Sequence, residues 1–318
     1  MKRYAIGALL GLLLTVLAVV VIAVKAEEMP RIASIWPLAL AIGAAVAAWW
    51  LQGLISAVLA RPQLGNLRVV DMVRIYLAGM FIGGISPIRG AEIPYEVYLL
   101  KRLGLSAGEG STVTVTKGLI NVLVLTLGAL GGLAFTSELP KVENLNLLAA
   151  GLAIGGIWAL AVFLVRKRSK KVVKRAQRPG WRAKISSFFR DMWQSFVLLW
   201  RREHRALLIY SSALMILYWA FRLSFGPLAL MAGGWSGDWV PVVLAQLFLS
   251  SFILPFAPTP GGSGATELSF AALLSAYVSD SHLLSGVLIY AGLTHYLPMA
   301  VGAFFVGRQL WQGTVSNE

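Results

Sequence analysis

Long apolar runs bounded by charged residues dominate the pattern of positions along the chain. Six runs are long enough to cross a bilayer as helices, namely 4–24, 33–59, 111–135, 145–165, 206–231 and 283–307. A membrane-spanning helix needs about 20 predominantly apolar residues to cross roughly 30 Å of hydrocarbon. The pattern therefore predicts an all-α polytopic membrane protein in which one bundle accounts for nearly the whole chain.

Two further apolar stretches are interrupted by proline and glycine. Residues 69–100 contain a break over 83–90, and residues 239–278 contain a break over 255–264. Proline lacks the N–H that a helix interior needs, and glycine weakens a helix by about 1 kcal/mol. We therefore expect two helices on either side of each break. A membrane tolerates such a break only where protein or a water-filled cavity satisfies the freed backbone groups.

The basic residues predict an orientation for the bundle. Residues 166–205 hold 14 of the 28 Lys and Arg residues, against two acidic residues, Asp191 and Glu203. Basic loops usually stay in the cytoplasm, where they also attract anionic lipid headgroups. We therefore expect a multi-pass protein of the plasma or inner cell membrane with this loop and both termini in the cytoplasm. Nucleic acid is not an expected partner.

This orientation is consistent only if each broken stretch enters the membrane and returns to the same side as a re-entrant hairpin. The chain then reads as two halves of opposite orientation within one membrane domain, 1–135 and 145–307, with 166–205 as a basic insertion. Each half consists of two spans, a broken hairpin and a span. Inverted repeats with paired broken helices are a transporter architecture, and the pair marks the substrate site.

One segment of the basic insertion has a different, amphipathic pattern. Between residues 185 and 200, apolar residues recur at a spacing of three to four and basic residues flank them. Such a helix either lies in the membrane interface or packs on the cytoplasmic end of the bundle. The sequence leaves both alternatives open.

The composition excludes a soluble domain and several kinds of chemistry. Hydrophobic residues make up 58% of the chain and charged residues 13%, where soluble domains average about 45–50% and about 25%. The chain has no cysteine, and its three histidines are scattered. We therefore expect no metal site, no cofactor and no cysteine nucleophile.

Charged residues at predicted membrane depth are the candidates for function. Glu92 and Glu96 are four apart and share a helix face, and Glu267 lies in the first turn of the helix after the second break, with Ser263 or Gly264 as its expected cap. Acidic residues also stabilise helix N-termini, so capping is the alternative. The functional reading is that these carboxylates line a cavity where two helix N-termini offer N–H groups to a phosphate.

Basic residues complete this candidate site. Arg89 lies in the first break, while Lys117 and Arg222 lie inside predicted spans, where charges are costly and usually paired. Lys117 is near enough to a span end to reach the interface instead, whereas Arg222 is expected to form an ion pair. The candidate substrate-binding residues are Arg89, Glu92, Glu96, Lys117, Arg222, Thr259, Ser263 and Glu267. Other polar residues are expected to have structural roles. Asp71 and Arg74 are expected to form an interfacial pair, and Gln246 a hydrogen bond between helices.

An intramembrane hydrolase is the enzymatic alternative. Residues 261–264 fit the G-x-S-G pattern around a nucleophilic serine, Ser263, and His295 lies in a later span. No His/Asn cluster stands in an earlier span to stabilise an oxyanion, and small residues in a membrane break match this pattern easily. We therefore expect no enzymatic activity.

Two motifs resemble a known family. Residues 258–273, read as PTPGGSGATELSFAAL, closely resemble the TPGGSG-x-x-E segment of a flippase-like membrane family that includes the transmembrane region of lysylphosphatidylglycerol synthases. Residues 86–91 and 98–106 are similar to its first signature, including the ending YLL-x-R-x-GLS, and residues 294–298 are similar to its last span. The chain departs from the family at Thr116-Lys117, where many members carry Glu-Arg, and at Ala291, where many carry Arg.

The resemblance implies a lipid-translocating protein whose headgroup chemistry is done by a separate synthase. A flippase or transporter of a polar-headed phospho- or glycolipid is the expected function. A non-transporting membrane partner of a lipid- or glycan-modifying enzyme is the alternative. The paired breaks favour transport, because a partner protein has no need of charges at membrane depth.

Overall fold

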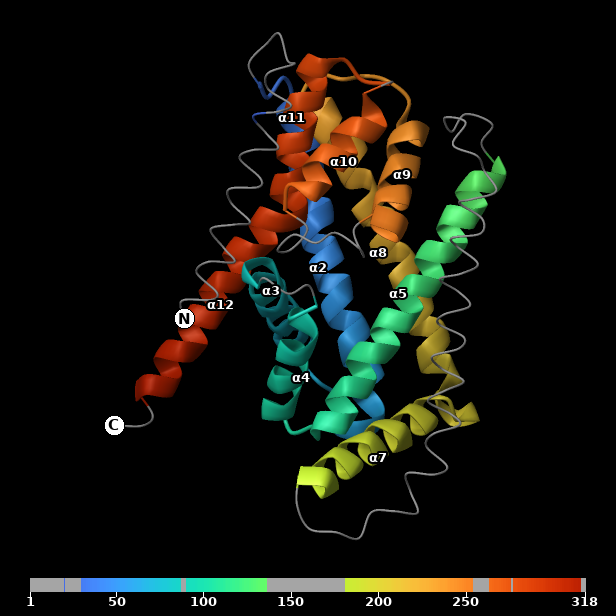
Figure 1. Cartoon of the computed structure of the whole chain (residues 1–318), viewed down its shortest axis with the longest axis vertical. Coiled ribbons are helices and arrows are strands. Elements are labelled where there is room, and N and C mark those ends of the chain that lie inside the picture. Colours follow the sequence, from blue (N-terminus) through green and yellow to red (C-terminus); the bar gives the residue numbers. More distant parts are fainter. Residues whose placement is uncertain are drawn as a thin grey trace. The chain divides into compact units, whose positions relative to one another are not determined.

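The computed structural model describes residue 20 and residues 30–86, 90–135, 181–253, 263–275 and 277–315. These residues form helices and connecting turns, without a strand among them (Figure 1). The helices are α2 (Ile35–Leu64), α3 (Val69–Ile85), α4 (Glu92–Arg102), α5 (Ala107–Phe135), α7 (Trp181–Leu199), η1 (Arg202–His204), α8 (Arg205–Ala232), α9 (Trp239–Phe248), η2 (Leu249–Ile253), α10 (Ala265–Leu274), α11 (Asp280–Ala291), η5 (Gly292–Tyr296) and α12 (Leu297–Val315).

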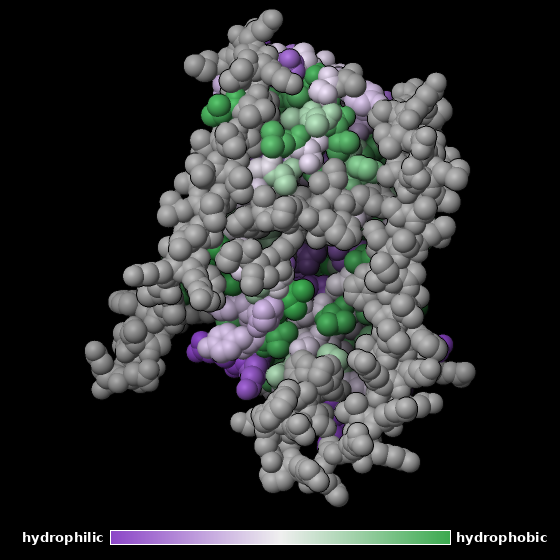
Figure 2. Space-filling view, in the orientation of Figure 1, coloured by the Kyte–Doolittle hydropathy of each residue, from purple (hydrophilic) through white to green (hydrophobic). Residues whose placement is uncertain are grey.

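Four helical runs within the described ranges are long and apolar enough to cross a membrane. They are Ile35–Leu64, Ala107–Gly132, Arg205–Ala232 and Asp280–Arg308, which correspond to four of the six predicted spans. The other two predicted spans, 4–24 and 145–165, lie outside the described residues. Large apolar side chains on these runs are exposed, including Leu127 at 60%, Ile209 at 71% and Phe304 at 65%. Figure 2 likewise shows apolar residues at the surface, as expected for helices that face lipid.

Both predicted breaks are confirmed as ends of helices. In the first, α3 ends at Ile85 and α4 begins at Glu92 after Gly90, whose φ of 90° favours glycine. In the second, α9 continues into a π-helix, η2, and α10 begins after Gly264, which caps it with a φ of 76°. Of the two predicted caps, Gly264 is therefore the one observed.

The chain divides into two compact units. One contains residues 1–54, 68–96 and 216–318, and the other contains 55–67 and 97–215. We call them the first and second unit and describe each by itself.

Helix α3 packs closely against α12 within the first unit. A Cβ atom at Gly302 would overlap the backbone carbonyl of Leu77, and one at Gly84 would overlap the side chain of Met299. Small residues let helix backbones approach each other, as is typical of helix pairs in membranes. The glycines of α3 and α12 therefore explain this pairing.

Gln246 joins α9 to α8 by replacing a missing helical hydrogen bond. Pro227 has no N–H to donate to the carbonyl of Leu223, and Gln246 Nε2 donates to that oxygen at 2.7 Å instead. The Oε1 atom of the same amide accepts from the N–H of Gly226 at 3.3 Å. A Cβ at Gly226 would lie 2.6 Å from Gln246 Nε2. The predicted helix-to-helix hydrogen bond is thus confirmed, and it depends on both the proline and the glycine.

The substitution Gln246→Leu is expected to lower the thermal stability of the purified protein. It leaves the carbonyl of Leu223 without a partner in a buried position, which costs about 1–3 kcal/mol. Gln194→Leu, at an exposed site on α7, is the control that should leave the melting temperature unchanged. Equal melting temperatures for the parent and Gln246→Leu in detergent would contradict this account.

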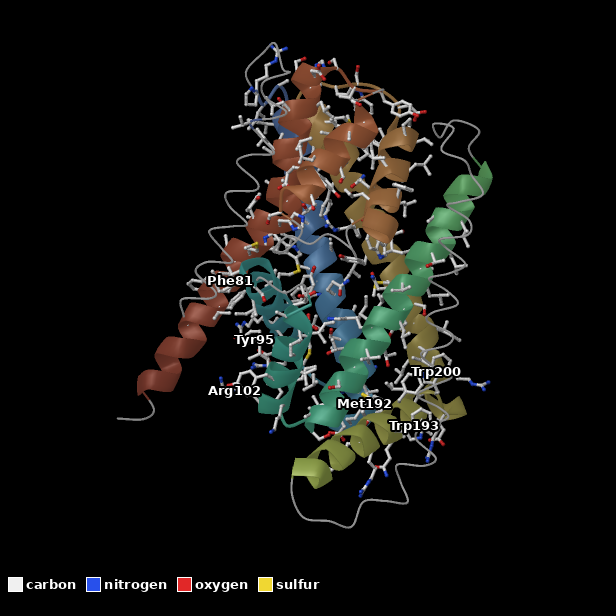
Figure 3. All side chains as sticks on the ribbon, in the orientation of Figure 1. Phe81, Tyr95, Arg102, Met192, Trp193 and Trp200 are labelled. Atoms are coloured by element: carbon white, nitrogen blue, oxygen red, sulfur yellow. The ribbon has the colours of Figure 1, made fainter. Side chains whose placement is uncertain are left out.

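Helix α7 packs against α5 within the second unit. The hydroxyl of Thr112 donates to the carbonyl of Met192 at 2.8 Å, and a Cβ at Gly108 would lie 2.5 Å from Asp191 Cβ. Met192, Trp193 and Trp200 are labelled along α7 in Figure 3. The predicted amphipathic helix is therefore present, and these contacts favour the reading in which it packs on other helices.

Candidate functional site

Two carboxylates of α4 lie against two glycines of α3 in the first unit. A Cβ at Gly83 would lie 2.7 Å from Glu92 Oε2, and a Cβ at Gly79 would lie 3.1 Å from Glu96 Cγ. Both pairs are four residues apart on their helices, so one face of α4 meets a side-chain-free stripe of α3. The prediction that Glu92 and Glu96 share a face is borne out. Glu92 is half-buried and Glu96 is 7% exposed, so the glycines make room for carboxylates.

Arg222 lies inside α8 among aromatic side chains. Its guanidinium forms a side-chain hydrogen bond with Tyr218, one turn earlier on α8, and its Cζ lies 5.1 Å from the centre of the Phe225 ring. The Nη1 atom is buried without a hydrogen-bond partner among the described residues. The expected ion pair is therefore not what the described part of the chain presents. A phenol and an aromatic ring contact the charged guanidinium, and one of its N–H groups has no hydrogen-bond partner among the described residues.

Tyrosine side chains connect Arg222 with carboxylates on both broken stretches. Tyr76 of α3 hydrogen-bonds to Tyr218 and lies within electrostatic range of Arg222 and Glu96. Tyr290 of α11 lies within electrostatic range of both Arg222 and Glu267. The ring of Tyr290 stacks on Phe270 of α10 with centroids 4.2 Å apart, which fixes its position. We call the set Glu96, Tyr76, Tyr218, Arg222, Tyr290 and Glu267 the buried polar chain.

Glu267 ends this chain in the first turn of α10. Its side chain has no exposed surface, and its Oε1 atom accepts a hydrogen bond from the Tyr296 hydroxyl at 3.2 Å. The Oε2 atom is buried and finds no hydrogen-bond partner within the described ranges. Its hydrogen bonds with the backbone at Gly264 and Glu267 agree with the capping alternative. Capping alone does not require complete burial or an oxygen without a partner.

Ser263 and His295 do not form the pair that a hydrolase requires in the contacts of this region. Ser263 is buried just before α10, while His295 Nε2 lies 3.1 Å from the hydroxyl of Thr266. A serine nucleophile needs its base within hydrogen-bonding reach of the hydroxyl. The geometry therefore couples His295 to Thr266, which is next to Glu267 in the chain.

Three further candidates lie in the other unit or outside the described residues. Lys117 lies half-buried on α5 in the second unit, while Arg89 and Thr259 lie outside the described residues. Asp71 is bonded to Arg74 at 3.1 Å and to Arg68 at 3.0 Å at an exposed position, which confirms the predicted interfacial pair. Such an exposed pair adds about 0–1 kcal/mol to stability.

Sequence reasoning missed the tyrosines of this site. Tyr218 stands four residues before Arg222 and so on the same face of α8, which is a signal that the sequence does contain. Tyr76, Tyr290 and Tyr296 come from other helices, and only the fold relates them to Arg222 and Glu267. A tyrosine inside an apolar span has an ordinary packing role, so the residue type alone does not point to a site.

The second unit contains a pocket of about 810 Å³ beside α7. Glu109, Asp191, Trp193 and Arg201 line it together with Gln63, whose two amide atoms are buried without partners in the described part of the chain. Glu109 already serves as a capping group, because its Oε2 accepts from the N–H of Ser106 at 2.7 Å. This pocket is separate from the buried polar chain, which lies wholly in the first unit.

Comparison with known proteins identifies the family. A search of the curated proteins finds no match to the chain. The family model for the lysylphosphatidylglycerol synthase transmembrane region matches residues 5–302, which is nearly the whole sequence. The resemblance of the second break and of the first hairpin is thus part of a match that covers both units. The chain is a membrane-embedded helical protein and belongs to the lysylphosphatidylglycerol synthase transmembrane region family.

Proposed function

We propose that this protein is a flippase that moves a polar-headed phospho- or glycolipid between the two leaflets. The observation that carries the proposal is the buried polar chain of the first unit, in which a donor on Arg222 and an acceptor on Glu267 have no partner among the described residues. Unsatisfied polar groups at membrane depth are costly and usually functional. A lipid headgroup supplies both kinds of partner, since its phosphate accepts and its hydroxyl or amine donates.

The proposed path follows the two broken stretches. The N-terminus of α4 would offer N–H groups to a phosphate, and Arg89 of the first break would add a charge-assisted hydrogen bond to it. Acyl chains stay in the bilayer while the headgroup moves past Arg222 and the tyrosines. The two halves, 1–135 and 145–307, act as an inverted repeat that opens the path alternately to either side.

The proposal also includes the orientation of the protein in the membrane and its relation to a lipid-modifying enzyme. Both termini and the basic segment 166–205 lie in the cytoplasm, where this segment contacts anionic headgroups of the cell membrane. The chain performs no headgroup chemistry and uses no cofactor, and a separate synthase makes the lipid.

Lipid exchange in vesicles tests the proposal. The purified protein is placed in phosphatidylcholine vesicles with a panel of head-labelled phospho- and glycolipids, and a membrane-impermeant quencher is added outside. We expect the quencher to reach the inner-leaflet label of at least one lipid within the assay, whereas protein-free vesicles protect that label. Protection of the inner leaflet across the whole panel would reject the flippase and favour a non-transporting partner of a lipid-modifying enzyme.

A further inference from the structure

Among the described residues, no cation pairs with the buried carboxylate of Glu267. Its side chain is completely buried and hydrogen-bonds with the Tyr296 hydroxyl and with the backbone at Gly264 and at Glu267 itself, while Oε2 has no partner among the described residues. Removing an ionised carboxylate from water costs several kcal/mol unless a cation or several donors compensate it. The donors on record are a phenol hydroxyl at 3.2 Å and backbone N–H groups at the start of α10, and none of them carries a charge. The geometry therefore leaves Glu267 Oε2 as an acceptor for a mobile partner.

The helices packed against α10 offer Glu267 few polar groups. Helix α10 packs against α9, η2 and α11. The segments α9 and η2 contain no acidic, basic or histidine residue, and the groups facing Glu267 from the following helices are Tyr290 of α11 and Tyr296 of η5. His295 bonds to the neighbouring Thr266, and Arg222 is reached only through Tyr290. Among the described residues, the groups that reach the carboxylate are thus the Tyr296 hydroxyl and backbone N–H groups, and no ammonium or guanidinium bonds to it.

Irregular backbone flanks the same residue on both sides. The π-helix η2 precedes the second break, and the π-helix η5 contains His295 and Tyr296. Single π-turns within α-helices occur frequently at functional sites. Here η5 carries Tyr296, which bonds to Glu267, and His295, which bonds to Thr266. The backbone hydrogen bonds of η5 differ from those of α11 and α12. Such a segment can change its geometry without unfolding either helix.

We propose that Glu267 binds one proton and releases it once in each transport cycle, so that lipid movement is coupled to a proton gradient. This inference rests on the proposed lipid transport. In one orientation of the site, a proton from water adds to the unpartnered oxygen and removes the charge. In the other orientation, water reaches the carboxyl from the opposite side, and the proton leaves Oε2 to that water and restores the charge. The step requires no other reactant, because the same proton that enters on one side leaves on the other.

The buried polar chain and the Thr266–His295 pair supply the path for this proton. Imidazole and phenol groups both donate and accept hydrogen bonds, so they relay protons over short distances. Thr266, which bonds to His295, precedes Glu267 in the chain, and Tyr290 lies within electrostatic range of both Glu267 and Arg222. A proton is also the smallest cation that a single carboxylate can hold. Among the described residues no cluster of three acidic, histidine or cysteine side chains could hold a metal ion.

Infrared difference spectroscopy between acidic and alkaline pH tests the proton binding without any added lipid. The full-length purified protein should show one protonated-carboxyl band that Glu267→Gln lacks and that Glu109→Gln, a change in the capping group of α5, retains. Tyr296→Phe removes the hydrogen bond to Oε1 and should shift the band to higher frequency, which a purely structural residue would not do. A band that is unchanged in Glu267→Gln would overturn the assignment.

A pH gradient across vesicles tests the coupling. Phosphatidylcholine vesicles carry the lipid that exchanges fastest in the panel, and potassium with valinomycin holds the membrane potential at zero. With a gradient of one pH unit, coupling to one proton should shift the leaflet distribution by up to about tenfold, and a protonophore should abolish the shift. Fast exchange with an even distribution, or a distribution that follows a sodium gradient instead, would overturn the inference but not the proposed function. Absence of any exchange would reject the proposed function and, with it, the coupling.

Discussion

The variant Glu267→Gln is expected to exchange lipid no faster than protein-free vesicles. Glutamine has nearly the same shape, but it replaces an acceptor oxygen by an amide group that cannot take up a proton or receive a cation. The carboxylate has no exposed surface and keeps one oxygen without a partner in the described part of the chain. Losing a buried charge at the site therefore removes the interaction that the headgroup or proton would make, while the helix around it is preserved.

The matched control for this prediction is Glu109→Gln. Glu109 also lies in the first turn of a helix, where it accepts from the N–H of Ser106, and glutamine can replace glutamate in such a capping box. We expect this variant to exchange lipid at the parental rate. If Glu267→Gln also reached the parental rate, the buried carboxylate would have no part in transport. A loss of folded protein in Glu267→Gln, seen by gel filtration in detergent, would instead support the capping role.

The spans and breaks could be predicted because they depend on local chemistry. Apolar length decides whether a helix can cross the membrane, and four described runs follow the predicted boundaries closely. Proline and glycine decide where a helix ends, as the ends of α3 at Ile85 and the cap of α10 at Gly264 illustrate. Each of these features is determined within a few residues of the chain, so no tertiary information is required.

The partners of the charged residues could not be predicted, because they depend on which helix faces meet. Arg222 was expected to pair with a carboxylate, yet the structure surrounds it with Tyr218, Phe225 and the hydroxyls of two other helices. Electrostatic cost requires a partner for a buried charge but does not say which one. Likewise, the glycines at 79 and 83 read as weak helix positions in the sequence. The structure shows instead that they make room for Glu96 and Glu92.

The variant Arg222→Leu is expected to lose lipid transport without losing stability. Arg222 has one buried N–H group without a described partner and is held by a phenol and an aromatic ring rather than by a carboxylate. Replacing a buried charge by an apolar side chain of similar volume is often neutral or stabilising. A hydrogen bond to a charged group contributes about 1.5–3 kcal/mol. Its loss should raise the lipid fraction needed for half-maximal exchange roughly 10- to 150-fold.

Two further variants separate the charge of Arg222 from its geometry. Arg222→Lys keeps the charge but loses the planar group that contacts both Tyr218 and Phe225. We therefore expect its lipid exchange rate to lie between the rate of the parent and that of Arg222→Leu. Tyr218→Phe removes the hydroxyl that orients the guanidinium and should weaken exchange while the fold is retained. The decisive measurement is the melting temperature of each variant beside its exchange rate. A structural arginine would lose both together. An arginine that serves the headgroup should lose exchange at an unchanged or higher melting temperature, because its unsatisfied N–H is a cost that only the bound lipid removes.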